Sequence, residues 1–298
     1  MTEVVTALSE QARAKVNLTL RVIGRRVDGY HELESVVVFA DCADGLTLAP
    51  GQDLSLDASG PRVTECGDNA DNLVIKAARL LAELVPGLKT GGFSLDKQLP
   101  IAAGIGGGSA DAAAALRLLA RSNGIALDDP RLMEAAKRTG ADVPVCVASA
   151  SCIMGGIGEK LTPLPLPRLS AVMVNPRVGV PTKDVFAALG LKNGQLNVGV
   201  TDVVAAPAWP DRDAPLGEWI AALSAGVNDL EAPAKQVQPV VGEVIALLAA
   251  CDGALLARMS GSGATCFAIF GSDAEAKAAA QAIQRAHPNW WVHAGTLS

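Results

Sequence analysis

The stretch Leu99-Pro100-Ile101-Ala102-Ala103-Gly104-Ile105-Gly106-Gly107-Gly108-Ser109-Ala110-Asp111 lies between a short strand pattern and an alanine-rich helix pattern. Glycines lack a Cβ, so the backbone N–H groups of such a loop can turn toward a ligand. The first turn of the following helix adds unpaired N–H groups and a partial positive charge, which suits a phosphate. Ser109 can cap the helix or offer its hydroxyl to a phosphate. The loop alone leaves a flexible loop with a helix cap open as an alternative.

The amino-acid sequence of this stretch excludes two familiar phosphate-binding loops. A Walker A loop ends in Gly-Lys-Ser or Gly-Lys-Thr, but no lysine lies between Lys97 and Lys137. The dinucleotide fingerprint needs Gly-x-Gly-x-x-Gly, and counting from Gly104 its last glycine is replaced by Ser109. The remaining interpretation is a set of backbone donors at a helix start.

The chain before and just after this loop reads as strands and helices. Residues 12–22 alternate apolar and polar, which predicts a half-buried strand with Lys15 and Asn17 side by side on its exposed face. Further strands are predicted at residues 34–39, 45–49, 53–57 and 92–96. Apolar residues at helical spacing predict a helix at 69–84, which Pro86-Gly87 ends. A second helix is predicted at 109–123.

Three prolines, Pro163, Pro165 and Pro167, mark the predicted domain boundary. We therefore predict an N-terminal domain at residues 1–163 and a C-terminal domain at 164–298. The second domain should contain strands at 170–174, 255–259 and 266–270, helices from about Thr182 and at 240–250 and 273–286, and a final strand. The variable stretch from Val203 to Pro215 has no assigned element. This mixture predicts an α+β fold.

Composition limits the class of protein. At 298 residues the chain suits two domains, and half of its residues are apolar. The net charge of −6 and the sequence pI of about 5.2 argue against broad nucleic-acid binding, which needs a basic surface. No apolar run is long enough for a membrane span, and the start lacks the pattern of a secretory signal. We expect a cytoplasmic protein whose six cysteines stay reduced and form no zinc site.

Three separated segments resemble the GHMP kinase superfamily. The first is Ala14-Lys15-Val16-Asn17-Leu18 together with Gly24-Arg25-Arg26-Val27-Asp28-Gly29-Tyr30-His31-Glu32-Leu33, the second is the glycine loop, and the third is Met259-Ser260-Gly261-Ser262-Gly263-Ala264-Thr265-Cys266-Phe267. Each is moderately specific, and all three in this order are highly specific. Departures from the family pattern are Arg13, where proline is usual, and Ala102, where glycine is common. Neither removes a chemical group.

The resemblance implies a fold and a cofactor. It implies two domains, an N-terminal one like domain 2 of ribosomal protein S5 and a C-terminal ferredoxin-like α/β sandwich, with the active site in the cleft between them. It also implies an ATP- and Mg²⁺-dependent kinase. The implied ATP-binding residues are Pro100, Ile101, Ala102, Ala103, Gly104, Ile105, Gly106, Gly107, Gly108, Ser109 and Ala110.

The resemblance also implies the catalytic pair Lys15 and Asp142. A carboxylate close to a lysine ammonium stays ionised at neutral pH and can accept the proton of a substrate hydroxyl. The lysine can hold that carboxylate in place and offset charge that grows on the transferred phosphoryl group. By sequence alone, Asp142 could be a turn or cap residue and Lys15 a solvated strand lysine. Whether the aspartate is a base or mainly orients the hydroxyl stays open.

The Asp-Gly-Tyr-His element resembles the branch of the superfamily that phosphorylates the 2-hydroxyl of a cytidyl diphosphate methylerythritol in the non-mevalonate route to isoprenoids. That branch implies Tyr30 and Phe186 stacking on the base and His31 hydrogen-bonding it. Asn17 and Thr182 are the further implied substrate contacts. Residues Gly261, Ser262 and Gly263 are implied to form a turn that closes on the site.

A different class of function has to be weighed against the kinase. Related N-terminal folds occur in RNA-associated proteins, so a non-catalytic module that binds nucleotide or contacts RNA is the alternative. The acidic pI and the intact Lys15 and Asp142 count against it. The expected partner is therefore a small-molecule substrate, with no nucleic acid and no membrane, in a monomer or homodimer.

Overall fold

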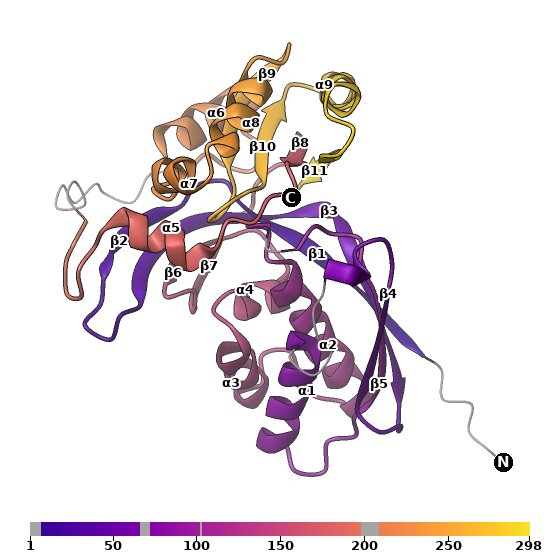
Figure 1. Cartoon of the computed structure of the whole chain (residues 1–298). Coiled ribbons are helices and arrows are strands. Elements are labelled where there is room, and N and C mark those ends of the chain that lie inside the picture. Colours follow the sequence, from indigo (N-terminus) through magenta and orange to yellow (C-terminus); the bar gives the residue numbers. More distant parts are fainter. Residues whose placement is uncertain (1–6, 66–71, 102, 198–208) are drawn as a thin grey trace. The chain divides into compact units, whose positions relative to one another are not determined.

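The computed structural model describes residues 7–65, 72–101, 103–197 and 209–298, which form two compact units (Figure 1). Unit 1 comprises residues 1–15, 42–101 and 106–149, and unit 2 comprises residues 16–41, 102–105 and 150–298. The units therefore alternate along the chain. The predicted boundary at residue 163 concerns family domains and stays a prediction.

Unit 1 combines strands with a group of helices. Its elements are the first part of β1 (Leu8–Asn17), the second part of β3 (His31–Pro50), β4 (Ser55–Ser59), β5 (Gly91–Asp96), the short 3-10 helix η1 (Val63–Glu65), α1 (Leu73–Leu84), α2 (Gly107–Asn123), α3 (Pro130–Thr139) and α4 (Val143–Ala148). β5 pairs antiparallel with β3 and parallel with β4. The four helices α1 to α4 lie together on one side of β4 and β5 (Figure 1).

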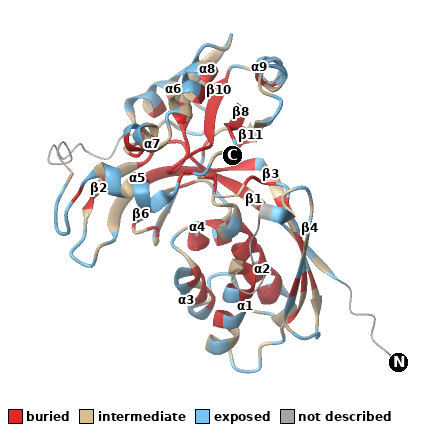
Figure 2. Cartoon of the chain, in the orientation of Figure 1, coloured by how far each residue is buried: buried red, intermediate tan, exposed pale blue. Residues whose placement is uncertain are grey.

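Helix α2 is the centre of unit 1. It packs against α1, α3 and α4, and its alanines from Ala112 to Ala115 are fully buried. Small side chains let neighbouring helices approach the α2 backbone closely, so the alanine-rich pattern that predicted a helix also makes it a core element. Figure 2 shows α2 buried along most of its length. The glycine loop therefore runs into a helix that is buried along most of its length.

Unit 2 contains two sets of strands and five helices among the residues that the structure describes. Its elements are β2 (Arg21–Arg25), the first part of β3, β6 (Cys152–Gly156), β7 (Lys160–Pro163), β8 (Leu169–Asn175), α5 (Thr182–Leu189), α6 (Leu216–Ala225), α7 (Glu231–Val237), α8 (Val240–Ala249), β9 (Ala254–Met259), β10 (Cys266–Phe270), α9 (Asp273–Ala286) and β11 (Trp291–Leu297). β11, β8, β10 and β9 form an antiparallel sheet in that order. Helix α8 packs on β9 and β10, and α9 packs on β8 and β11. The predicted α+β class is confirmed.

Several predicted boundaries were wrong. The strand predicted at 12–22 is two strands, because the backbone between them bonds elsewhere: Leu18 N donates to Val36 O and Leu20 N donates to Val227 O. The strands predicted at 34–39 and 45–49 are one strand, β3, whose two parts pair with different partners, β6 and β5. The strand predicted at 53–57 is β4, two residues later. The helix predicted from Ser109 begins at Gly107.

Helix α1 begins at Leu73, and its N-cap residue Asn72 accepts a hydrogen bond from Val74 N. Residues 69–71 of the predicted helix lie outside the described residues. The expectation that Lys15 and Asn17 lie on an exposed face was also wrong, since both are buried. The apolar face from Ala12 to Val22 is buried as predicted, so β1 is covered on both sides at these positions.

The five described cysteines are free thiols, and Cys66 lies outside the described residues. The part of the chain that the structure describes contains no helix with the length and hydropathy needed to cross a bilayer.

Candidate functional site

Lys15 and Asp142 form an ion pair within unit 1. Lys15 Nζ lies 2.9 Å from Asp142 Oδ2, and the lysine side chain is 5% exposed while the aspartate is 37% exposed. Asp142 is the N-cap residue of α4, yet its side chain makes no capping hydrogen bond. The carboxylate is therefore held by the lysine and remains open on its other side. A half-exposed carboxylate beside a buried cation is well suited to meet a substrate hydroxyl.

A cysteine one turn further along α4 takes no part in nucleophilic chemistry. Burial raises the pKa of Cys146 to about 12, and the neighbouring Asp142 carboxylate adds to this shift. A thiol with such a pKa stays protonated at neutral pH, and only the thiolate is strongly nucleophilic. The thiol of Cys146 therefore does not compete with Asp142 and Lys15 as the candidate catalytic groups of this part of unit 1.

The glycine loop supplies a helix start with free donors. Gly106 is the N-cap of α2 in the left-handed conformation (φ 64°), and its carbonyl accepts the N–H of Ala110 at 2.8 Å. The amides of the first helical turn, from Gly107 onward, have no intrahelical partner. Because Gly106 is the cap, Ser109 is not, and its hydroxyl belongs to the first turn. A Cβ on Gly106 would lie 3.4 Å from the Cβ of Lys15, so the loop packs on the predicted catalytic lysine.

The other predicted ATP-binding residues differ in their surroundings. Ala103, Ile105 and Ala110 are buried, so their side chains anchor the segment and leave the backbone to face a ligand. Ala102 lies outside the described residues.

The turn from Ser260 to Gly263 connects β9 with β10 and contacts Gly104 within unit 2. Ser260 Oγ donates to Gly104 O at 3.0 Å and accepts the N–H of Asn17 at 3.1 Å. A Cβ on Gly104, whose φ is +74°, would come within 2.5 Å of Ser260 O. The hydroxyls of Thr182 and Ser262 lie 2.9 Å apart. The predicted closing turn is therefore joined to three predicted site residues: Gly104, Asn17 and Thr182.

The predicted base-binding residues lie together in unit 2, although not as a sandwich. The rings of His31 and Phe186 stack, with centroids 4.3 Å apart at 27°. Tyr30 is 59% exposed. Burial lowers the pKa of His31, and the Arg25 guanidinium lowers it further, so the ring is neutral at physiological pH. The structure brings the histidine onto Phe186 at the place predicted for a nucleobase.

Three buried polar atoms among the described residues have no hydrogen-bond partner: Asn17 Oδ1, His31 Nε2 and Asp111 Oδ1. Buried polar groups in folded proteins are nearly always paired, so an orphan calls for an explanation. Two of the three belong to residues predicted from the sequence to bind substrate. Asn17 Oδ1 can accept a hydrogen bond from a ligand hydroxyl, and His31 Nε2 can form a hydrogen bond with the edge of a base. Both atoms therefore fit a polar ligand.

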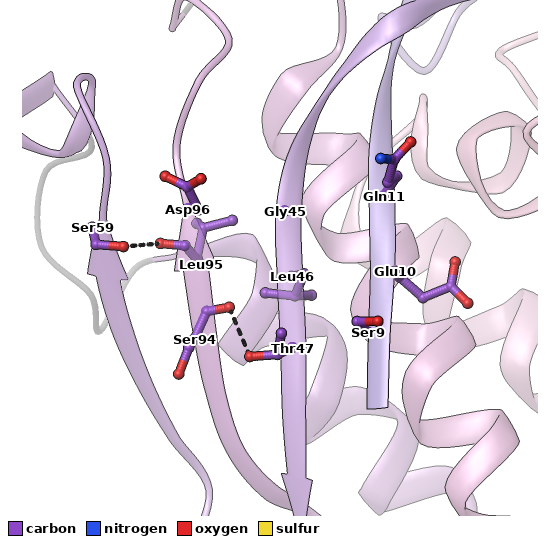
Figure 3. A pocket seen from close by; sticks show the side chains of 10 residues that line it. All are labelled: Ser9, Glu10, Gln11, Gly45, Leu46, Thr47, Ser59, Ser94, Leu95 and Asp96. Atoms are coloured by element: carbon purple, nitrogen blue, oxygen red, sulfur yellow. Dashed lines mark hydrogen bonds between the residues drawn. The ribbon is translucent and has the colours of Figure 1, made fainter. Parts of the chain in front are cut away.

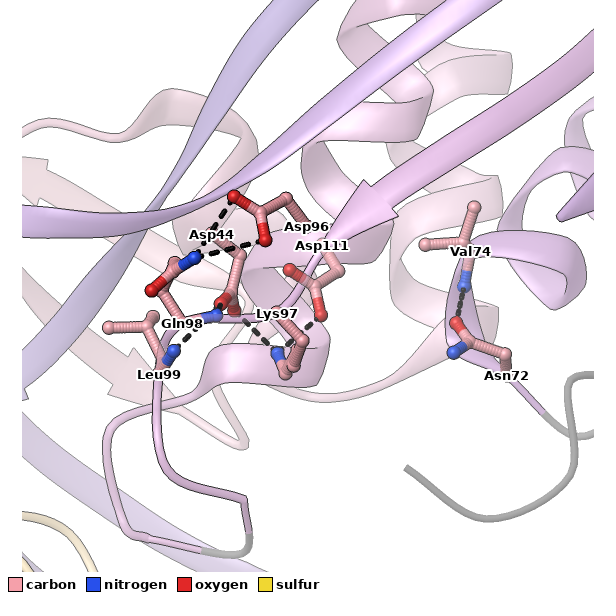
Figure 4. A network of polar contacts seen from close by, with 8 residues as sticks. All are labelled: Asp44, Asn72, Val74, Asp96, Lys97, Gln98, Leu99 and Asp111. Atoms are coloured by element: carbon pink, nitrogen blue, oxygen red, sulfur yellow. Dashed lines mark hydrogen bonds and ion pairs between the residues drawn. The ribbon is translucent and has the colours of Figure 1, made fainter. Parts of the chain in front are cut away.

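Sequence reasoning missed a buried ion cluster beside the glycine loop, shown in Figure 4. Lys97 Nζ forms ion pairs with Asp44 and, at 2.7 Å, with Asp111, and all three residues are buried. The available signal was the position of Lys97 just before the loop and of Asp111 just after it. Asp44 lies far away in the sequence, and no pattern linked it to them.

Unit 1 also contains a hollow of about 530 Å³ (Figure 3). It is lined by β1, β3, β4 and β5, from Ser9 and Glu10 to Asp96. None of its lining residues is a predicted site residue. Among the described residues, no three histidine, cysteine, aspartate or glutamate side chains gather as a metal site.

Comparison with known families gives the class of protein. The family model described as "GHMP kinases N terminal domain" matches residues 72–155, and "GHMP kinases C terminal" matches residues 212–289. The chain belongs to the GHMP kinase family, and it is a phosphotransferase with the two-domain α+β fold of that family. The kinases of this family use ATP.

Individual relatives narrow the comparison. The 4-diphosphocytidyl-2-C-methyl-D-erythritol kinase of a Rhodopseudomonas palustris strain is 76% identical over 293 residues, which cover 98% of this chain and 96% of the relative. The enzyme of the same name from Nitrobacter hamburgensis is 69% identical over 98% of this chain and 96% of its own. A crystal structure of 4-(cytidine 5'-diphospho)-2C-methyl-D-erythritol kinase has a TM-score of 0.72 at 35% identity, covering 98% of this chain and 99% of that chain.

A homoserine kinase from Cytophaga hutchinsonii shares the fold, with a TM-score of 0.71 at 19% identity over 100% of this chain and 96% of its own. At that identity the likeness concerns the fold alone. Substrate choice has to come from the site residues and from the relatives with high identity.

Proposed function

We propose that this chain transfers the γ-phosphoryl group of ATP to the 2-hydroxyl of 4-diphosphocytidyl-2-C-methyl-D-erythritol, giving the 2-phosphate and ADP. This is a step of the non-mevalonate route to isoprenoids. The observation that carries the proposal is the Lys15–Asp142 ion pair, 2.9 Å long, in a chain 76% identical to a kinase of that name.

Phosphoryl transfer requires cradled phosphates, a positioned hydroxyl and neutralised charge. The first-turn amides of α2 bind the phosphates, since a helix start offers unpaired N–H groups. Asp142 orients the 2-hydroxyl and accepts its proton, and Lys15 holds Asp142 and offsets the charge on the transferred group. When bound with ATP, Mg²⁺ would supply further charge neutralisation.

The cytidine end of the substrate is assigned to the residues of unit 2. Phe186 and Tyr30 offer ring faces, and the unpaired Nε2 of His31 offers a hydrogen bond to the base edge. A base that enters beside Phe186 takes the position that the His31 ring holds in this structure. Asn17 and Thr182 supply polar contacts along the substrate, and residues 261–263 form the closing turn.

A turnover experiment tests this proposal directly. The purified chain is incubated with ATP, Mg²⁺ and the cytidyl substrate, and ADP release is followed together with the phosphorus spectrum of the product. Homoserine and mevalonate, the acceptors of other family members, serve as comparison substrates. We expect turnover of the cytidyl compound alone. Robust turnover of homoserine or mevalonate, with none of the cytidyl compound, would overturn the assignment. We further propose that the enzyme is cytoplasmic and acts as a monomer or homodimer.

A further inference from the structure

The buried cluster Asp44, Lys97 and Asp111, called here the charged trio, connects the two ends of the glycine loop. Asp44 Oδ1 accepts hydrogen bonds from the backbone N–H of Gln98 at 2.6 Å and from that of Leu99 at 2.8 Å. These two residues lie where the chain enters the loop. The other oxygen of Asp44, Oδ2, accepts from Lys97 Nζ. Asp44 therefore fixes the chain where it enters the loop.

The same lysine reaches the far end of the loop. Lys97 Nζ donates to Asp111 Oδ2 at 2.7 Å, and Asp111 lies in α2, just after the first helical turn. A Cβ on Gly107 would lie 3.4 Å from Lys97 Nζ and 3.9 Å from Asp44 Oδ2, so the first residue of α2 packs directly on the trio. The trio thus contacts both the entry and the exit of the loop.

The charges of the trio show that it does not bind phosphate itself. The Lys97 ammonium lies between two carboxylates, so its charge is already matched within the protein. A lysine that contacts a phosphate, as in a Walker A loop, needs a charge free for the ligand. The three residues are at most 3% exposed, which leaves no open side for a nucleotide. Such a buried, charge-paired cluster has one defined geometry, which suits a positioning role.

We propose that the charged trio is a positioning element for ATP: it sets the distance between the two ends of the glycine loop and so the direction of the first-turn amides of α2. This inference rests on the proposed role of the loop in phosphate binding. It predicts that damage to the trio weakens ATP binding while the second substrate still binds normally.

The test compares Asp44→Ala, Asp44→Asn and Asp111→Asn with the control Asp96→Asn. Asp96 is exposed and directly precedes Lys97, and its carboxylate accepts hydrogen bonds from the Gln98 side chain. For Asp44→Ala we expect the KM for ATP to rise at least ~10-fold and the KM for the cytidyl substrate to change less than ~2-fold. Asp44→Asn retains an oxygen for the two amides, so its KM for ATP should rise less. Asp96→Asn should match the unmodified chain.

A second measurement keeps the inference testable if Asp44→Ala does not fold. Asp111→Asn preserves the side-chain shape and the Asp44–Lys97 ion pair. Hydrogen exchange of the Gln98 and Leu99 amides should become faster in this variant, and the dissociation constant of a non-hydrolysable ATP analogue should rise ~3- to 10-fold. Equal rises in both KM values, or analogue affinity and amide exchange equal to those of the control, would overturn the inference.

The outcomes separate this inference from the proposed function. If the unmodified chain does not phosphorylate the cytidyl compound, the proposed function fails, and the analogue affinities of the variants still decide the role of the trio. If the unmodified chain turns over the cytidyl compound and the trio variants bind the analogue normally, only the positioning role fails.

Discussion

At the scale of single residues, the proposed chemistry depends on Asp142, a carboxylate at the N-cap position of α4 that makes no capping hydrogen bond. Its bond to the buried Lys15 orients it, and its partial exposure leaves it accessible. An aspartate at this position could cap α4, but the Asp142 carboxylate makes no hydrogen bond to the helix and bonds to Lys15 through Oδ2. This availability is what a proton acceptor requires.

We predict that Asp142→Asn lowers kcat by ~10²- to 10⁴-fold, because the amide retains the shape of the carboxylate but cannot accept the hydroxyl proton. The KM for ATP should change less than ~2-fold. Steady-state kinetics with varied ATP check both values. The matched control is Glu83→Gln, which removes the carboxylate of an exposed ion pair, 3.2 Å from Arg138. Undiminished kcat in Asp142→Asn would reject the assigned role.

A second prediction concerns the base-binding histidine. His31→Ala removes the polar atom assigned to the edge of the base, and a buried polar group left without its partner costs ~1–3 kcal/mol. We expect the KM for the cytidyl substrate to rise ~5- to 150-fold and the KM for ATP to stay constant. His287→Ala is the control, because His287 stacks on Trp290 with centroids 3.8 Å apart. A rise in the KM for ATP alone would contradict the assignment.

At the scale of elements, the glycines of the loop differ in backbone conformation and in the space around them. Gly104 has φ +74° and no room for a Cβ, since Ser260 O would be 2.5 Å away. Gly108 lies inside α2, where a Cβ would meet only Leu73 Cδ1, at 3.5 Å. Two glycines of one motif thus serve different purposes: Gly104 permits contact with the β9–β10 turn, and Gly108 keeps the helix start uncovered.

We therefore predict opposite effects of two alanine substitutions on stability. Gly104→Ala should lower the free energy of unfolding by ~1–3 kcal/mol, from backbone strain and the clash with Ser260. Gly108→Ala should leave it unchanged or raise it by up to ~1 kcal/mol, since alanine is the better helix former. Urea denaturation of both variants measures the difference. Equal effects would show that the contact between Gly104 and the turn is not a constraint.

At the scale of the whole molecule, the net charge is −6, and unit 1 nevertheless buries a cluster of three ionisable side chains, Asp44, Lys97 and Asp111. Burial raises the pKa of Asp111 to about 7, an effect that Lys97 opposes and Asp44 adds to. In the unfolded chain the ordinary value of 3.8 applies. The folded protein therefore holds a proton on Asp111 in a range where the unfolded chain has released it, and this contribution to stability is lost as pH rises toward 7.

We predict that the difference in unfolding free energy between the unmodified chain and Asp111→Asn depends on pH. It should be most favourable to the unmodified chain near pH 4 and should fall between about pH 4 and 7, by at most ~1.4 kcal/mol per pH unit, then level off. Urea denaturation across this range measures it. The same difference for the exposed Asp96→Asn should stay flat, and parallel curves for the two variants would contradict the shift.

Much of the site could be predicted from local sequence. The glycine loop, the alternation of residues 12–22 and the Asp-Gly-Tyr-His element each identify their residues within a few neighbours, because turns, pleats and helix starts depend on short-range geometry. Family likeness then assigned roles to Lys15, Asp142 and the base-binding residues. The continuous strand β3 was missed, because its two parts pair with strands that are distant in sequence.

The sequence by itself determined the class of fold, the kinase family and the identity of the candidate site residues. Only the tertiary structure decided that Lys15 and Asn17 are buried, that His31 stacks on Phe186, and that Asp44 joins Lys97 and Asp111. The reason is physical. A motif specifies the local backbone path, whereas burial and charge pairing depend on which distant segments pack against it, and Asp44 lies 53 positions from the lysine it binds.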